Sequence, residues 1–162
     1  MRSRTAVWFE TKVKYDKMQD DGIVKSTTDA YVVDALCFTE AEASIIEEMS
    51  SSISGEFNIT DIKKASYKEV FFSDDVKDDR WYKAKLQYIN IDEKTGKEKR
   101  QNVYFLVQAG TLLRAVNNID QVMSKTMIDY VIASVTETKF IDVFEHTSKL
   151  ESQVKEDKPE YE

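Results

Sequence analysis

The feature that most constrains this sequence is an internal repeat with an offset of about 73 residues. Residues 8–15 align with residues 81–88, which keep Trp, Lys and Tyr, and residues 31–33 fall on 104–106. After a one-residue slip, Thr39 and Ala43 match Thr111 and Ala115. Five apolar positions keep the first offset: Ile59, Ile62, Tyr67, Val70 and Phe71 fall on Ile132, Val135, Phe140, Val143 and Phe144. Blocks in one order at one offset indicate a tandem duplication.

Each half begins with a pattern that is typical of a β-hairpin. Residues 7–15 alternate between two sets of side chains, which is the period of a strand with one buried face. Asp20-Asp21-Gly22 in the first half and residues 92–96 in the second half supply turn residues before the next apolar run. We therefore expect a hairpin at the start of each repeat.

A helix and a long strand are expected after each hairpin. Thr39-Glu40-Ala41-Glu42 matches a capping box, in which the hydroxyl accepts from a backbone amide and a glutamate reaches back. In the second half, Thr111 precedes residues with helical apolar spacing and is the expected cap. Residues 57–72 and 130–144 are rich in Ile, Val and aromatic side chains and predict one long strand each.

The repeating unit is therefore strand, strand, helix, strand, used twice. We expect an α+β fold with antiparallel curved sheets and two helices packed on one face. A half of about 70 residues buries little apolar surface alone, so the two repeats are expected to share a core. The predicted organisation is a single globular domain over 1–144, with repeats at 5–72 and 80–144, a connector at 73–79, and an acidic mobile tail at 145–162.

Composition excludes most nucleophilic and metal chemistry. The 162 residues include one Cys and one His, so no internal disulfide, Cys/His zinc site or Cys-His catalytic pair can form. The acidic connector lacks the glycine and the ligand spacing of a calcium loop, and the glycines never form a phosphate-binding motif. We predict a protein that is not an enzyme and that uses no metal and no cofactor.

Charge and targeting narrow the partners further. No apolar run approaches the roughly 18 residues of a membrane span, and Glu10 follows too soon for a signal sequence, so we expect a cytoplasmic protein without membrane contact. The net charge of -7 argues against coating nucleic acid through bulk positive charge. Residues 1–144 are closer to balance, however, with 20 basic and 24 acidic residues.

The most informative functional feature is the polar face of the first strand of each repeat. One Trp and two Lys residues project together there, because alternate side chains of a strand share a face. An exposed indole stacks on a nucleic-acid base for about 1–3 kcal/mol, while ammonium groups follow the phosphates. The competing interpretation places both indoles in the core. The predicted nucleic-acid-binding residues are Trp8, Lys12, Lys14, Trp81, Lys83, Lys85, Lys97, Lys99 and Arg100.

Two functional hypotheses follow from these observations. The first is a non-enzymatic binding module for single-stranded DNA or RNA, whose acidic tail occupies the basic groove or docks on a protein partner. The second is a protein–protein adaptor or phage-type inhibitor that binds a basic partner surface. Long strands also permit edge-to-edge pairing in a homodimer.

Five blocks stand out, at residues 8–12, 31–35, 38–43, 60–65 and 129–134. Together they resemble a family of domains of unknown function from gut Bacteroidetes and their phages. The resemblance covers nearly the whole chain up to Phe144 and leaves the tail outside. It implies a bacterial or phage cytoplasmic protein and supplies neither an activity nor a catalytic residue.

Overall fold

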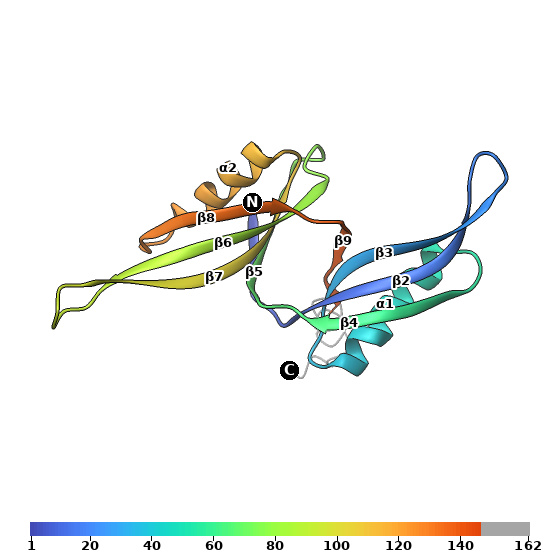
Figure 1. Ribbon diagram of the computed structural model, residues 1–162, viewed down its shortest axis with the longest axis horizontal. Coiled ribbons are helices and arrows are strands. Elements are labelled where there is room, and N and C mark those ends of the chain that lie inside the picture. The colour runs from blue at the N-terminus through green and yellow to red at the C-terminus, as the bar shows by residue number, and fades with distance from the viewer. Residues whose placement is uncertain (147–162) are drawn as a thin grey trace, which may run out of the picture. The chain divides into compact units, whose positions relative to one another are not determined.

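The computed structural model describes residues 1–146, and these form two helices and nine strands (Figure 1). The α+β class expected from the sequence is confirmed. The described chain divides into two compact units: unit 1 contains residues 1–6 and 66–139, and unit 2 contains residues 7–65 and 140–146. No helix within residues 1–146 is long and apolar enough to cross a membrane.

Unit 1 is a five-stranded open sheet, here called sheet A, with one helix on one face. In spatial order its strands are β1 (Arg2–Arg4), β5 (Tyr67–Phe72), β7 (Glu98–Ala109), β6 (Arg80–Ile91) and β8 (Tyr130–Glu137). The β5–β7 pair is parallel and the other pairs are antiparallel. Helix α2 (Leu112–Met123) covers the face that presents Phe71, Leu86 and Phe105, all fully buried.

Unit 2 is built in the same way around a four-stranded sheet, here called sheet B. Its strands lie in the order β4 (Phe57–Lys64), β2 (Trp8–Met18), β3 (Val24–Asp34) and β9 (Phe140–Phe144), with β9 parallel to β3. Helix α1 (Phe38–Ser52) packs against the face that carries Phe9, Val13 and Val33. Each unit therefore has a hydrophobic cluster between its own helix and its own sheet.

The repeat seen in the sequence extends to the register of the strand pairs. The β2–β4 ladder shifts between Lys12 and Val13, and the β6–β8 ladder shifts at the equivalent place, between Lys85 and Leu86. The parallel pairs also share one irregularity, which lies beside the first residue of β9 and of β5. Both repeats thus adopt the same pairing, bulges included.

The structure corrects the alignment of the middle of the repeat. Phe9 pairs with Val33, and the equivalent Tyr82 pairs with Val107, so β7 follows β3 at an offset one residue longer than that of the first strands. The extra residue lies in the second hairpin turn, which joins Ile91 to Glu98, whereas the first joins Met18 to Val24. The buried helix positions keep this longer offset: Ala41, Ser44, Ile45 and Met49 fall on Ala115, Asn118, Ile119 and Met123.

The predicted cap of the first helix is wrong, whereas that of the second is confirmed. Helix α1 begins at Phe38 after Cys37, so Thr39 lies inside the first turn, and Glu40 Oε2 accepts from Leu36 N at 3.0 Å. In α2 the Thr111 hydroxyl accepts from Arg114 N at 3.2 Å, as a capping side chain does.

Each predicted long strand is two strands in the structure. Residues 65–66 separate β4 from β5, and residues 138–139 separate β8 from β9. The second part of each pairs with the other repeat: β5 joins β7 in sheet A, and β9 joins β3 in sheet B. The two repeats therefore exchange their closing strands. The single domain over 1–144 stays a prediction, and the tail from residue 147 onward lies outside the described residues.

Candidate functional site

The two tryptophans of the predicted binding face are buried. Trp8 is 1% exposed and Trp81 is 2% exposed, so neither indole is free to stack on a base. Each lies near the end of a central strand, where its carbonyl accepts a backbone amide from the linker that precedes a closing strand, Ala65 in one repeat and Thr138 in the other. The expectation of exposed indoles is therefore wrong, because this end of the strand is enclosed by packing.

Three of the predicted basic residues do lie together, on the face of sheet A opposite α2. Ala84 and Leu86 pack under the helix, so their neighbours Lys83 and Lys85 point to the other face. Arg100 lies on that same face, because it is paired with Ile89 and its Nη1 donates to Gln87 Oε1 at 3.2 Å. We call this surface the basic face: Lys83, Lys85, Gln87, Arg100, Asn102 and Tyr104.

An aromatic residue lies within the basic face. Tyr104 is directly opposite Lys85 in the β6–β7 ladder and is 38% exposed. Next to it Tyr67 is buried, and the Lys83 Nζ lies 5.6 Å from the centre of its ring. Tyr104 is not among the predicted binding residues, although alternation with the buried Val103 and Phe105 places it on the polar face.

The residues that flank the two lysines on neighbouring strands are uncharged. Lys83 pairs with Leu106 and Thr136, and Lys85 pairs with Tyr104 and Ser134. Toward the hairpin end of this face, Glu98 Oε2 lies 3.7 Å from Arg100 Nε. In these two ladders the lysines are therefore paired with apolar, hydroxyl and aromatic residues.

The equivalent face of sheet B has a more balanced charge. Lys12 and Lys14 are exposed there, as predicted from alternation. Lys12 is paired with Asp61 on β4, and Glu10 on the same face is paired with Lys63. Cation and acid alternate across these strands, which is the arrangement of a solvated surface.

The structure does not place the remaining hairpin lysines on the basic face. Lys97 lies in the turn before β7, and Lys99 points away from Arg100 because adjacent residues of a strand face opposite sides. The Lys99 ammonium lies 3.6 Å from Asp92 Oδ2, across the turn. Of the nine predicted residues, Lys83, Lys85 and Arg100 therefore form the candidate site.

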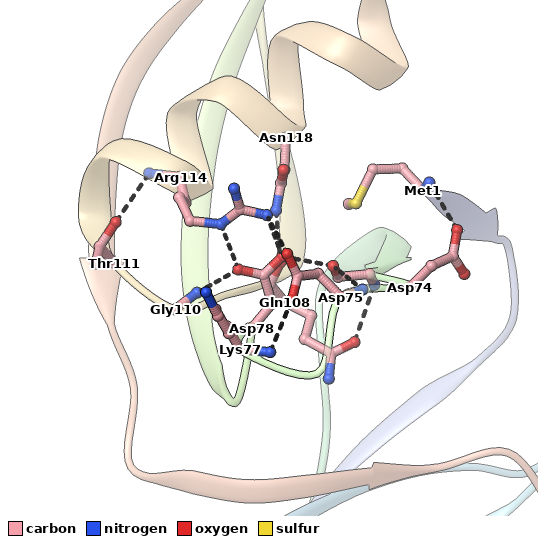
Figure 2. Close-up of polar contacts among 11 residues, drawn as sticks. Met1, Asp74, Asp75, Lys77, Asp78, Gln108, Gly110, Thr111, Arg114 and Asn118 are labelled. Carbon is pink, nitrogen blue, oxygen red and sulfur yellow. Dashed lines mark hydrogen bonds and ion pairs between the residues drawn. The ribbon is translucent and has the colours of Figure 1, made fainter.

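The connector carries an ion pair with a buried carboxylate, which the sequence did not reveal. Figure 2 shows Arg114 of α2 directed at Asp78, whose Oδ1 accepts from Arg114 Nε at 2.6 Å and from Gly110 N at 2.8 Å. Asp78 Oδ2 accepts from Arg114 Nη2 at 2.7 Å and from the Ser73 hydroxyl. The Arg114 hydrogen bonds hold the pKa of Asp78 well below its usual range, against the opposing effect of burial.

The acidic connector is held in place by this ion pair. Asp78 is 2% exposed, and its carboxylate oxygens already accept from Arg114, Gly110 and Ser73. Asp74 instead lies 3.3 Å from the amino terminus of Met1 (Figure 2). The carboxylates thus hold the connector against α2 and against the start of the chain. No sequence spacing links Asp78 with Arg114, so the pair could not be found before the fold was known.

The single histidine lies at the end of the closing strand of unit 2. Its backbone amide donates to the buried carboxylate of Asp34, and its Nε2 lies 3.5 Å from both Glu47 Oε2 and Glu48 Oε1 on α1. Nearby, burial raises the pKa of Asp142, and the charge of Glu48 adds to that rise. His146 therefore packs against α1 where β9 ends.

Comparison with known proteins places the chain by family. No curated protein and no solved structure matches it. A family model described as a domain of unknown function, DUF4494, matches residues 7–146, which include every described helix and strand except β1. Because this match covers most of the chain, the protein belongs to the DUF4494 family of domains of unknown function.

Proposed function

We propose that the protein is a non-enzymatic module that binds single-stranded nucleic acid on the basic face of sheet A. The observation that carries this proposal is the position of Lys83 and Lys85 beside the exposed ring of Tyr104, with uncharged partners on both neighbouring strands. An open strand face with cations beside an aromatic ring is a common way to hold a single strand without reading its sequence.

The chemistry of each group fits this ligand. Lys83 and Lys85 are two residues apart on one strand, so their side chains leave the sheet about 7 Å from each other and can contact separate phosphates. The ring of Tyr104 offers a stacking surface for a base, worth about 1–3 kcal/mol. Gln87 and Asn102 are hydrogen-bonded to each other at 3.2 Å, and their remaining amide groups can pair with base edges.

The proposal differs from the sequence hypothesis in which residues act. Trp8 and Trp81 belong to the packed interior, and Tyr104 replaces them as the aromatic contact. Lys12 and Lys14 form a second, weaker basic surface on sheet B, where Asp61 reduces the local charge. We further propose that the protein works in the cytoplasm of a bacterium or during infection by a phage.

The test is a fluorescence anisotropy titration of a labelled oligonucleotide at low salt. We expect wild-type protein to bind, and the Lys83→Gln/Lys85→Gln variant to lose at least tenfold in affinity, since charge-assisted contacts are worth about 1 kcal/mol or more each. The Lys94→Gln/Lys125→Gln variant is the matched control, because it removes the same charge from exposed positions of unit 1 that lie outside the basic face.

Two results would count against the proposal. Equal losses in both double variants would show that binding follows net charge rather than the basic face. No anisotropy change with any DNA or RNA oligonucleotide would reject the function and favour the second hypothesis, an adaptor or inhibitor that binds a basic protein surface.

A further inference from the structure

The exchange of closing strands between the repeats is enforced by the length of two linkers. Strand β4 ends at Lys64 on one edge of sheet B, and β5 begins at Tyr67 in sheet A. Residues 65–66 are all that connects them. In the second repeat, residues 138–139 connect β8, on the edge of sheet A, to β9 in sheet B.

A two-residue linker cannot return a closing strand to its own sheet. The place beside β3, which β9 occupies, lies across two strands from β4, or about 14 Å at the usual strand spacing. Lys64 is level with Val33 of β3 across the sheet, whereas a closing strand beside β3 starts opposite Ala30, three residues earlier. The distance from Lys64 to that starting point is therefore about 17 Å. Three Cα–Cα steps from Lys64 to Tyr67 reach about 11 Å at most.

The same geometry holds in the second repeat. Glu137, the last residue of β8, is level with Val107 of β7 across the sheet. A closing strand beside β7 starts opposite Tyr104, which is again three residues earlier. Neither repeat can therefore fill the open edge of its own hairpin. Each hairpin edge is a docking site that requires a closing strand from another repeat.

The two docking sites accept strands of one pattern. Strands β5 and β9 each begin with an aromatic residue and carry an acid, then Val, then Phe, and the Val residues pair with Leu106 and Val32. The end of each strand is fixed alike: Ser73 N donates to Gln108 Oε1, and His146 N donates to Asp34 Oδ1. Gln108 and Asp34 are equivalent positions, since each pairs with the tryptophan of its hairpin.

We propose that the edges of β3 and β7 are binding sites for the closing strand of a second repeat and that they hold this strand in trans as well as in cis. Single repeats are then obligate partners of one another. The chain corresponds to a strand-exchanged dimer whose two copies have been joined by the connector, and the connector is dispensable for keeping the copies together.

The test is to cut the folded chain in the connector. A protease site inserted after Val76, which is 94% exposed, allows cleavage of the native protein into two pieces. We expect one species of intact mass in size exclusion with light scattering, through dilution into the nanomolar range, and two separate pieces in denaturant. A second variant with the site after Asp74 leaves the loop of Asp75 to Asp78 uninterrupted, in case the first insertion disturbs folding.

Matched substitutions test whether β5 and β9 hold the two pieces together. In the cut chain, Val70→Asp with Val143→Asp places charge at buried positions of β5 and β9 and is expected to release the pieces. Lys68→Asp with Ile141→Asp changes exposed positions of the same strands and should leave them associated. If the first pair does not fold uncut, Val143→Asp alone should dissociate at higher concentration than the wild-type chain. Separation of the wild-type pieces, or equal cohesion in both double variants, would overturn the proposal.

Discussion

At the scale of single residues, the connector ion pair shows how the repeats have diverged around one backbone amide. Gly110 N and Leu36 N are equivalent positions before the two helices. Leu36 N is satisfied by Glu40, one turn into α1. In the second helix Arg114 occupies the position equivalent to Glu40, and a guanidinium cannot accept a hydrogen bond. The carboxylate of Asp78 accepts from Gly110 N instead and also binds Arg114. The Asp78–Arg114 pair therefore completes the start of α2.

Asp78→Asn is expected to destabilise the protein by about 2–3 kcal/mol, because it removes the shorter of the two ion pairs of Arg114 and weakens the bond to Gly110 N. The free energy of unfolding in urea, measured at neutral pH, checks this value. Asp74→Asn is the control: its side chain is largely exposed, and we expect a change within about 0.5 kcal/mol. Equal effects of the two substitutions would contradict the role given to Asp78.

The ionisation of Asp78 should affect how the free energy of unfolding depends on pH. Because the folded pKa of Asp78 is lowered, its contribution is fully present above the unfolded pKa of about 4 and is lost as the pH falls through the acid range. We expect the wild-type free energy of unfolding to fall more steeply below about pH 4 than that of Asp78→Asn. Parallel pH profiles for the two proteins would argue against a charged Asp78 in the folded state.

Gly110 is required by a close approach rather than by its backbone angles. A Cβ at this position would lie 2.6 Å from the backbone carbonyl oxygen of Lys77, which is closer than real contacts allow. Gly110→Ala should therefore push the connector away from α2 and cost about 1–3 kcal/mol, measured by thermal or urea unfolding. Leu36→Ala, at the equivalent exposed position of the first repeat, is expected to change stability little.

At the scale of elements, local sequence patterns predicted the hairpins and helices, which depend on neighbouring residues. They did not predict the strand breaks and strand pairing, which depend on distant segments. Alternation and turn residues located both hairpins, and helical spacing located both helices. The break between β4 and β5 was missed, because residues 65–66 contain neither Gly nor Pro and both flanking segments favour strands. Which strand pairs with which is set by linker reach, which no local pattern reports.

The candidate site was predictable in part for the same reason. Alternation correctly placed Lys83 and Lys85 on the face opposite the helix, and it could have placed Tyr104 there as well. It also put Trp81 on that face, yet a strand pattern gives only the direction of a side chain and not what covers it. Burial of Trp81 depends on packing that includes Phe72, which another repeat contributes.

The two helix starts offer a matched test of capping. Thr111→Ala should cost about 1 kcal/mol, because the hydroxyl that accepts from Arg114 N is lost at a helix N-cap. Thr39→Ala should have almost no effect, since Thr39 is an exposed residue inside the first turn of α1. Denaturant midpoints of both variants decide the point. A larger loss in Thr39→Ala would restore the capping box that the sequence first indicated.

At the scale of the whole molecule, an acidic protein can bind a polyanion only if its cations are local, and salt dependence measures how many take part. Each phosphate contact on a single strand contributes about 0.7 to the slope of log affinity against log salt. If Lys83 and Lys85 each contact a phosphate, the Lys83→Gln/Lys85→Gln variant should lower that slope by about 1.4 relative to wild type.

Tyr104→Ala should weaken binding about fivefold or more and leave the slope unchanged, because stacking releases no counterion. Anisotropy titrations at several salt concentrations separate these effects. A slope that falls equally in the Lys83→Gln/Lys85→Gln and Lys94→Gln/Lys125→Gln variants would show that the net charge of -7, and not the basic face, governs the encounter.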